Sequence, residues 1–349
     1  MQTGLLTTLT ANECATATAQ AVALLRQGDI VALPTETVYG LAADALNPIA
    51  VAKIFEAKER PRFDPFIVHL PSRDWLEKIA DVPAKDRNLI LKLANKFWPG
   101  PFTIVLLKRE IVPEIVTAGL NSVAIRISAH PILAAIVCEV DRPLAAPSAN
   151  RFGRISPTSA QHVVDELSGR IPLIIDGGPT QHGLESTIVA VSAAQIRILR
   201  RGPITEEQLC EFGKVSVATA TQGISVPGQL PAHYAPKTPL RLVDNIESLV
   251  AQKSQRVGLL AWSGAFRRAA SSPLETRHSK MFAAVRNLSE REDLHEAAAN
   301  LFRYLRELDA LELDLIIAQR VPSQGLGAAI MDRLERAAHG RARAQDTRE

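Results

Sequence analysis

The motif Lys58-Glu59-Arg60-Pro61-Arg62 places three cationic side chains at alternate positions beside a proline. Arginine offers a planar fork to phosphate oxygens, and lysine offers a point charge. This spacing therefore suits a polyanion such as a triphosphate. The same residues also suit the end of a helix, where cations interact favourably with the helix dipole, and the motif alone favours that structural interpretation.

Other motifs place small polar side chains next to predicted strands. Ala146-Pro147-Ser148-Ala149-Asn150 follows the apolar pair Leu144-Ala145, and Glu185-Ser186-Thr187 enters a strand over residues 187–191. Their hydroxyl, amide and backbone N–H groups can bind a ligand, although serine and asparagine also favour ordinary turns. The pair Arg200-Arg201 follows another strand. It suits a phosphate clamp, but the motif alone favours a solvated edge.

The loop over residues 34–40 offers a second chemistry, the binding of a small polar substrate. Thr35, Thr37 and Tyr39 supply hydroxyl groups, and Glu36 supplies a carboxylate, at the end of a predicted strand. Ligands in open α/β sheets bind at the carboxyl ends of strands, but a solvated loop fits this segment equally well. His69 lies on an apolar strand, where a hydrogen-bonded core histidine is the simpler interpretation.

Several common catalytic motifs are missing from the sequence. It has no G-x-x-x-x-G-K-[ST] loop, no G-x-G-x-x-G fingerprint after a strand, no G-x-S-x-G elbow and no H-E-x-x-H pair. The eight histidines and three cysteines do not cluster at metal-ligand spacing. We therefore predict neither a P-loop NTPase nor a metal centre built from protein side chains.

The composition is that of an ordinary globular protein. The chain has 349 residues, 46% of them hydrophobic, and 40 Lys and Arg against 37 Asp and Glu give a net charge of +3. This length predicts two domains, and so small a net charge does not mark a general nucleic-acid binder. Three separated cysteines indicate reduced, buried thiols in a cytoplasmic protein. No apolar run approaches the roughly 18 residues of a membrane span.

Predicted strands and helices alternate along the first 210 residues. Thr10 and Glu13 fit a capping box for a helix that ends at Gly28, and Asn47-Pro48 begins a helix that runs to about Lys58. Buried strands are predicted at residues 30–33, 66–70, 102–107, 123–127, 173–175 and 187–191, and further helices at 87–97 and 132–140. This alternation predicts an α/β sheet in a first domain over residues 1–210.

The composition changes after residue 210. Residues 211–240 are rich in Gly, Ser, Thr and Pro, which indicates a linker. Its centre holds His233-Tyr234-Ala235-Pro236, and a functional role and a plain spacer are equally supported there. Strand patterns at 256–261 and 315–318 flank an amphipathic helix at 294–308, which predicts a second α/β domain over residues 241–349. The Arg-rich end indicates a solvated tail rather than an RNA-binding arm.

In order and spacing, these motifs together resemble the YrdC-like domain of L-threonylcarbamoyladenylate synthases. The matching segments are residues 34–41, Lys58-x-Arg60, residues 65–69, Trp98-Pro99-Gly100-Pro101, Arg126, Ser148-Ala149-Asn150 and Glu185-Ser186-Thr187. The linker motif, Gly325-Leu326-Gly327 and Met331-Asp332-Arg333-Leu334 resemble the long, two-domain members of the family. The combination of Lys-x-Arg with Ser-x-Asn is the specific part of this resemblance, which covers nearly the whole chain.

The resemblance implies a fold and an activity. The expected fold is α/β: an N-terminal YrdC-like twisted open sheet, a linker folding over the active site, and a smaller C-terminal Rossmann-like domain. The expected reaction condenses L-threonine, bicarbonate and ATP, with Mg²⁺, into L-threonylcarbamoyl-AMP and pyrophosphate. Threonylcarbamoyl-transferase proteins then modify an adenosine next to the anticodon of certain tRNAs. Positioning and charge neutralisation are sufficient for such chemistry, since no covalent enzyme nucleophile is required.

The resemblance also assigns roles to residues. Lys58 and Arg60 are the expected catalytic pair, which binds the phosphates and the reacting anions. The expected ATP contacts are Lys58, Arg62, Ser122, Ser148, Asn150, Ser156, Arg200 and Tyr234. The expected threonine contacts are Thr35, Thr37, His69, Arg126, Ala146 and Ser186. Arg126 would hold the substrate carboxylate in a bidentate fork, and Tyr234 would cover the nucleotide and exclude water.

Two departures from the family pattern and two rival functions stay open. Arg200-Arg201 stands where the family often has one arginine; we favour Arg200 as the nucleotide contact, with Arg201 as the alternative. The less typical insert Pro61-Arg62-Phe63-Asp64 leaves the role of Arg62 open. A non-catalytic RNA-binding or scaffolding module with a basic concave face predicts salt-dependent RNA affinity without ATP turnover. A carbamoyltransferase of the hydrogenase-maturation type is disfavoured, because the chain has no cysteine clusters.

Overall fold

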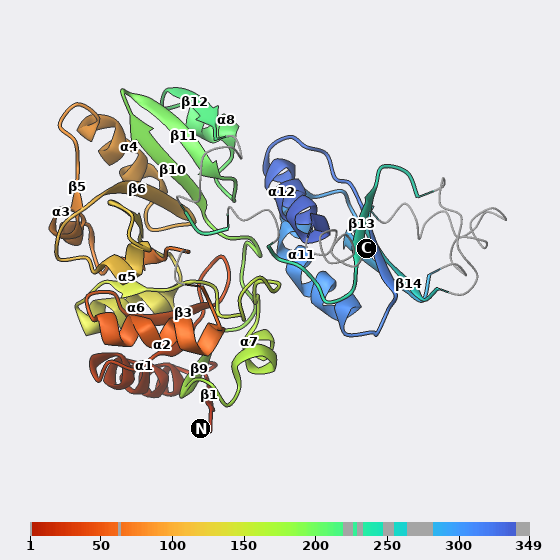
Figure 1. Cartoon of the computed structure of the whole chain (residues 1–349), viewed down its shortest axis with the longest axis horizontal. Helices are drawn as coiled ribbons and strands as arrows, with labels where there is room; N and C mark the ends of the chain where they lie inside the picture. Colours follow the sequence, from red (N-terminus) through yellow and green to blue (C-terminus); the bar gives the residue numbers. More distant parts are fainter. Residues whose placement is uncertain are drawn as a thin grey trace, which may run out of the picture. The chain divides into compact units, whose positions relative to one another are not determined.

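The protein divides into two compact units in a computed structural model that describes residues 2–61, 64–218, 226–228, 233–246, 255–263 and 282–339. The first unit comprises Met1–Phe152 and Ser156–Gln229, and the second comprises Gly153–Ile155 and Leu230–Glu349 (Figure 1). Residues 211–229 of the predicted linker are therefore part of the first unit, and residues 230–240 are part of the second.

Twelve strands within the described part of the first unit form one mixed, open α/β sheet. The order is β1-β9-β2-β3-β8-β4-β7-β6-β10-β11-β12, and β5 pairs with β6. In chain order the strands are β1 (Gly4–Thr7), β2 (Val31–Leu33), β3 (Gly40–Asp44), β4 (Ile67–His69), β5 (Ala80–Asp81), β6 (Phe102–Lys108), β7 (Ser122–Arg126), β8 (Leu144–Ala145), β9 (Leu173–Asp176), β10 (Thr187–Ser192), β11 (Gln195–Arg200) and β12 (Lys214–Val217).

The helices of the first unit cover both faces of this sheet. They are α1 (Ala11–Arg26), α2 (Pro48–Lys58), the 3-10 turn η1 (Arg73–Trp75), α3 (Leu76–Ile79), α4 (Arg87–Phe97), α5 (Glu114–Thr117), α6 (Pro131–Val140), α7 (Ala160–Leu167) and α8 (Glu206–Cys210). Val31 and Leu33 pack with α1 and α6, which contact each other, whereas Ala32 packs with α2. Because both faces are covered, β2 is apolar without interruption, as the sequence predicted.

Local signals explain where the helices begin and end. Thr10 and Glu13 form the predicted capping box of α1, and Gly28 follows the helix with a φ of +74°. The Asn47 side chain caps α2 ahead of Pro48, and Glu59 then takes a left-handed conformation that ends the helix after Lys58. The strand β3 was not predicted, because its sequence of Gly, Leu, Ala and Asp lacks β-branched residues. Its pairing with β2 and β8 makes it a strand.

The second unit is a smaller α/β sheet. Its strands β13 (Leu240–Val243), β14 (Val257–Ser263), β15 (Ala284–Ser289) and β16 (Leu315–Gln319) pair in parallel, in the order β13-β16-β14-β15. The helix α11 (Leu294–Asp309) packs on β14 and β15, and α12 (Leu326–His339) packs on β13 and α11 (Figure 1). Arg333 and Arg336 of the predicted Arg-rich end lie in α12, and residues 340–349 lie outside the described residues.

Two other predictions concern the surface. All three cysteines are free, but Cys138 and Cys210 are exposed and Cys14 is partly exposed, so the prediction of buried thiols is wrong. A thiol is small enough to be tolerated at a helix surface such as those of α6 and α8. Among the described helices, none is long and apolar enough to cross a membrane.

Candidate active site

Successive side chains of a strand point to opposite faces of a sheet, and in two neighbouring strands of the first sheet this places polar side chains on the same face. Val68 of β4 and Ile125 of β7 pack into the main core, so His69 and Arg126 point to the opposite face. The two strands are parallel, and their register pairs His69 with Arg126. The two residues therefore lie side by side at the carboxyl ends of their strands, where open α/β sheets bind ligands.

Arg126 is the centre of a buried network. Its Nη2 lies 2.6 Å from Oε1 of Glu36, with 4% and 5% of the two side chains exposed. Its Nη1 donates to Oγ1 of Thr37 at 3.0 Å, and its Nε donates to the carbonyl of Gly100 at 3.0 Å. The fork expected for the substrate carboxylate is thus bound to Glu36 and Thr37. A substrate would share the remaining N–H groups of a side chain that has five.

Glu36 is a site residue that the resemblance did not assign. Burial raises the pKa of Glu36, but the charge of Arg126 and hydrogen bonds outweigh burial and lower that pKa from 4.5 to about 2. The hydrogen bonds come from the hydroxyl of Ser128 and from the N–H of Ala129, the latter at 3.1 Å. Glu36 is therefore an anion at neutral pH, and it ties the loop after β2 to the segment after β7.

The hydroxyls of Thr35 and Thr37 organise the same loop. Oγ1 of Thr35 accepts the N–H groups of Thr37 and Val38 at 3.0 and 3.1 Å and donates to the carbonyl of Val38 at 2.7 Å. The two threonine hydroxyls lie 2.7 Å apart. The structure thus brings together four of the six residues expected to contact threonine: Thr35, Thr37, His69 and Arg126.

Two buried imidazoles lie near this network. Burial, with the neighbouring charge of Arg126, lowers the pKa of His69 from 6.5 to about 3. Burial likewise lowers the pKa of His130, against the charge of Glu36. Within the described residues, Nδ1 of each ring has no hydrogen-bond partner. Both rings are therefore neutral at pH 7, and each has a nitrogen available to a polar ligand.

Lys58 holds the loop that follows β8. Its buried Nζ donates to the carbonyl of Ser148 at 2.5 Å and to that of Asn150, and its own carbonyl accepts the N–H of Phe152 at 3.0 Å. Burial and the charge of Arg60 lower the pKa of Lys58 well below its usual value. A bound phosphate would favour the ammonium form of this side chain, whose third N–H could then bind a phosphate oxygen.

Arg60 forms a second buried ion pair. Its Nη2 lies 2.7 Å from Oδ2 of Asp64, with 4% and 1% of the side chains exposed, and donates to the carbonyl of Pro65 at 3.0 Å. Burial raises the pKa of Asp64, although the charges of Arg60, Lys58 and Arg200 oppose this rise. This carboxylate therefore lies among three cations. The one feature of the sequence that could have indicated Asp64 is the position of this carboxylate four residues after Arg60.

The structure separates the two neighbouring arginines at the end of β11. Arg200 is buried and donates to the carbonyl of Ser186 at 2.9 Å and to its hydroxyl at 3.1 Å. That hydroxyl lies 2.7 Å from Oγ1 of Thr103. Arg201 is less buried and pairs with Glu206 at 3.1 Å. Arg200 thus joins the polar face of the sheet, whereas Arg201 contacts the start of α8.

Other expected site residues lie along the same loops. The hydroxyl of Ser156 donates to Glu185 at 2.5 Å, and the N–H of Ala146 donates to the carbonyl of Ile67 at 3.0 Å. Ser122 shares a face of β7 with Arg126, but four residues of strand place the two about 13 Å apart. Arg62 lies outside the described residues, so its role stays a prediction.

Tyr234 belongs to the second unit. Its ring is buried and stacks on Phe302 of α11 at a centroid distance of 5.5 Å, and the guanidinium of Arg333 from α12 lies 5.2 Å from its centroid. The ring of His233 meets it edge-on at 4.1 Å. These contacts anchor the tyrosine in its own unit. Its expected place over the nucleotide stays a prediction.

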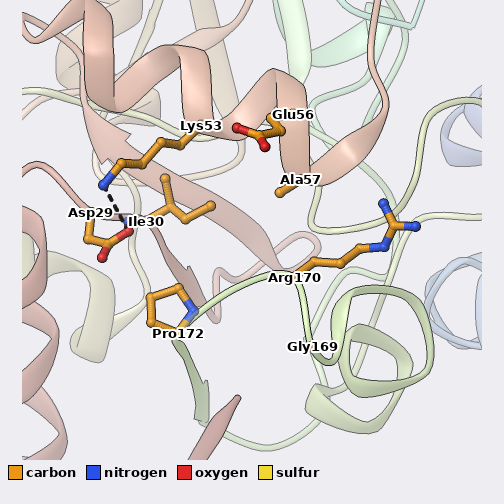
Figure 2. A pocket seen from close by; sticks show the side chains of 8 residues that line it. All are labelled: Asp29, Ile30, Lys53, Glu56, Ala57, Gly169, Arg170 and Pro172. Atoms are coloured by element: carbon orange, nitrogen blue, oxygen red, sulfur yellow. Dashed lines mark hydrogen bonds and ion pairs between the residues drawn. The ribbon is translucent and has the colours of Figure 1, made fainter. Parts of the chain in front are cut away.

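A pocket of about 410 Å³ lies elsewhere on the first unit. Figure 2 shows its lining by Asp29, Ile30, Lys53, Glu56, Ala57, Gly169, Arg170 and Pro172. None of the expected site residues is among them. Its lysine is paired with Asp29 at 3.2 Å, and Arg170 is paired with Glu59 at 2.7 Å. We therefore place the candidate site by the sheet register and the buried charges rather than by this pocket.

The donor set does not form a metal cage. In the part of the chain that the structure describes, no three His, Cys, Asp or Glu side chains gather where they could hold a metal ion. Asp64 and Glu36 are each paired with an arginine. These residues therefore do not fit a resident Mg²⁺ held by protein ligands. Mg²⁺ commonly binds instead through substrate phosphates and water.

Fold and site together define an α/β protein that gathers buried anion-binding groups on one face of an open sheet. The family described as "Telomere recombination" matches residues 23–202, and that described as "Threonylcarbamoyl-AMP synthase, C-terminal domain" matches residues 204–339. The chain is 38% identical to "Threonylcarbamoyl-AMP synthase" of Pyrococcus abyssi, over 91% of this chain and 92% of that protein. It is 40% identical to the Bacillus subtilis protein of the same name, over 93% of each chain.

A solved structure agrees with these sequence relationships. The chain matches P. abyssi Sua5 complexed with L-threonine with a TM-score of 0.85 and 36% identity, over 97% of this chain and 98% of that one. A variant of the same protein, with an adjacent histidine and tyrosine replaced by alanine, matches with a TM-score of 0.84. The chain therefore belongs to the threonylcarbamoyl-AMP synthase family, the two-domain form expected from its motifs.

Proposed function

We propose that this protein is an enzyme that condenses L-threonine, bicarbonate and ATP into L-threonylcarbamoyl-AMP and pyrophosphate. Its membership of the synthase family supports the reaction class. The observation that carries the proposal is the shared face of the sheet. There the Arg126 network with His69 lies at the carboxyl ends of β4 and β7, and Arg200 lies at the end of β11 on the same sheet.

The chemistry needs two bond-forming steps. The neutral amine of threonine attacks the carbon of bicarbonate, and loss of water gives a carbamate. A carbamate oxygen then attacks the α-phosphorus of ATP, and pyrophosphate leaves with the bonding electron pair. Charge neutralisation and orientation supply most of the rate enhancement in such transfers, which suits a site of buried cations without a nucleophilic side chain.

Threonine is proposed to bind at the Arg126 network. Arg126 offers its remaining N–H groups to the carboxylate, and Glu36 keeps that guanidinium in place. Neutral His69 offers a ring nitrogen to the hydroxyl or the amine. Thr35, Thr37, Ala146 and Ser186 complete the proposed contacts.

ATP is proposed to bind beside the cations held by Asp64 and by the loop after β8. Lys58, Arg60 and Arg200 are the proposed groups that neutralise the phosphates. All three lie near Asp64, because the charge of each acts to lower the pKa of that carboxyl group. The hydroxyls of Ser148 and Ser156 and the amide of Asn150 are the proposed hydrogen-bonding groups. Arg62, Ser122 and the linker residue Tyr234 are further proposed contacts. We also propose that Mg²⁺ enters on the phosphates of ATP.

The proposed partners of the protein follow from the chemistry of its product. A mixed anhydride of carbamate and phosphate hydrolyses readily, so threonylcarbamoyl-transferase proteins that act on tRNA are the proposed acceptors. We propose a cytoplasmic location, which the free cysteines support. An RNA-binding module is less well supported, because Lys58, Arg60 and Arg126 are each at most 8% exposed. Buried cations of this kind reach small anions rather than a duplex.

The deciding experiment is pyrophosphate release from ATP by the purified full chain. It is run with and without L-threonine and bicarbonate, with L-serine as the control amino acid and with EDTA to remove Mg²⁺. We expect release that requires threonine, bicarbonate and Mg²⁺ and is far slower with serine. A folded, ATP-binding protein whose pyrophosphate release ignores threonine and bicarbonate would contradict the proposal.

A further inference from the structure

The loop between β8 and α7 is shared by the two units. Lys58 holds its first part through the carbonyls of Ser148 and Asn150, and Glu185 holds its last part through Ser156. Both parts belong to the first unit, whereas Gly153–Ile155 between them belongs to the second. The proposed nucleotide contacts of this loop therefore flank three residues that are members of the second unit.

Helix α11 provides a main-chain anchor for these three residues. Nη2 of Arg306 donates to the carbonyl of Ile155, and the N–H of Ala235 donates to the carbonyl of Gly153 at 3.0 Å. Ile155 directly precedes Ser156. The half-buried guanidinium of Arg306 thus fixes the peptide group on which the Ser156 hydroxyl depends. A charge-assisted hydrogen bond to a carbonyl is stronger than a neutral one.

The same face of α11 also anchors the linker. Phe302 stacks on Tyr234, and the carboxylate of Asp309 accepts the N–H groups of Lys237 and Thr238 at 2.9 and 2.7 Å. Phe302, Arg306 and Asp309 are spaced by four and three residues, so they line one side of the helix. One helical face therefore holds both the linker and the middle of the loop.

We infer that Arg306 is a positioning residue for ATP, acting through the carbonyl of Ile155 to set the loop that carries Asn150 and Ser156. The nucleotide part of this inference rests on the proposed function. The loop part does not, because it concerns only the order of residues 150–157. Arg306 gives the second unit a role in the reaction without contact to the substrates.

The test compares Arg306→Ala, Arg306→Lys and Arg303→Ala in the full chain. Arg303 is the matched control, because it lies on the same helix, is exposed, and among the described residues contacts its helix neighbours Asn300 and Tyr304. Arg306→Lys keeps the charge and one donor within reach of the carbonyl. It also serves as the informative variant should Arg306→Ala fail to fold.

The first readout needs no activity: amide hydrogen exchange of the segment 150–157. We expect Arg306→Ala to speed exchange there about tenfold, Arg306→Lys to restore most of the protection, and Arg303→Ala to match wild type. Unchanged exchange in both Arg306 variants would overturn the inference. This result would stand whether or not the protein makes threonylcarbamoyl-AMP.

The second readout is the kinetics of threonine-dependent pyrophosphate release. We expect Arg306→Ala to raise the KM for ATP about tenfold and to leave the KM for threonine within about twofold, with partial rescue by lysine. Equal rises in both KM values would indicate a general structural role and overturn the inference. A wild-type protein without threonine-dependent release contradicts the proposed function instead, and hydrogen exchange then decides the role of Arg306.

Discussion

The guanidinium of Arg126 and the carboxylate of Glu36 lie 2.6 Å apart, and both side chains are almost completely buried. The pair joins the end of β7 to the loop after β2, two segments that are about 90 residues apart in the chain. Hydrogen bonds from Arg126 to Thr37 and from Ser128 to Glu36 link the same two segments. Removing one partner of such a pair leaves the other buried and uncompensated. The loop that carries Thr35 and Thr37 therefore depends on a charge that is not expected to touch the substrate.

Replacing Glu36 with glutamine tests this dependence. The amide keeps the shape but leaves Arg126 without a counter-charge, so we expect Glu36→Gln to lower the free energy of unfolding by about 3–5 kcal/mol. We also expect a higher KM for threonine, because the guanidinium is no longer fixed. Urea denaturation and steady-state kinetics measure the two effects.

Glu206→Gln is the matched control for this prediction. Glu206 pairs with Arg201 in the same way, but the two side chains are 38% and 30% exposed. Exposed pairs contribute about 0–1 kcal/mol, so this variant should behave nearly as wild type. Equal destabilisation by the two variants would show that the buried pair has no special role.

The free energy of unfolding should decrease in two stages as the pH is lowered. His69 has a pKa of about 3 in the folded protein against 6.5 normally, so the unfolded chain binds the extra proton first as the pH falls. Its contribution is complete above pH 6.5 and is lost as the pH falls towards 3. The pKa of Glu36 falls from 4.5 to about 2, so its contribution is lost only between about pH 4.5 and 2.

Urea denaturation at pH 7.5, 6.0 and 5.0 checks the first stage. Wild type should lose stability over this range, and His69→Asn should lose less, because the variant has no imidazole to protonate at that position. Some slope should persist in the variant, since burial also lowers the pKa of His130. Identical slopes in the two proteins would contradict the assigned role of His69 in acid sensitivity.

Local patterns in the sequence predicted much of the first unit. The capping box at Thr10 and Glu13, the cap at Asn47 and the apolar run of β2 were readable because each depends on neighbouring residues. The strand β3 was not, because its residues favour no strand and only its pairing partners make it one. Likewise, the exposure of Cys138 depends on the packing of α6, which no local pattern gives.

The candidate site shows the same division. The resemblance supplied Arg126 and Thr37, whose contact joins residues 89 positions apart. It did not supply Glu36 or Asp64, whose importance lies in burial beside an arginine rather than in a motif. Nor did it reveal that Lys58 binds two carbonyls of the loop after β8. Such partners follow from tertiary packing, which spacing alone does not determine.

Arg200 and Arg201 should differ sharply in function. Arg200 is buried, donates a hydrogen bond to Ser186, and carries a charge that acts to lower the pKa of Asp64. Arg201 is instead paired with Glu206 at the surface. We expect Arg200→Ala to raise the KM for ATP by about tenfold or more, because a charge-assisted contact is lost, and Arg201→Ala to change it less than about twofold. Threonine-dependent pyrophosphate release measures both variants. A larger effect for Arg201→Ala would assign the nucleotide contact to Arg201.

The ring of Tyr234 should matter more for fold and its hydroxyl more for function. The ring is buried between Phe302 and the guanidinium of Arg333, and the backbone of Tyr234 has a φ of +63°. Tyr234→Ala removes this packing, so we expect it to destabilise the second unit by about 3–5 kcal/mol. Tyr234→Phe keeps the ring contacts, so its stability should stay within about 1 kcal/mol of wild type.

The functional part of this prediction separates the linker's two possible roles. If the hydroxyl helps to cover the nucleotide, Tyr234→Phe will weaken ATP binding or let the intermediate hydrolyse, which appears as AMP formed in excess over transferred threonylcarbamoyl groups. Calorimetric ATP binding and the ratio of AMP to transferred product measure these two effects in a protein that is still folded. Wild-type values for both quantities in Tyr234→Phe, together with destabilised Tyr234→Ala, would mean that the tyrosine anchors the linker and takes no part in protecting the intermediate.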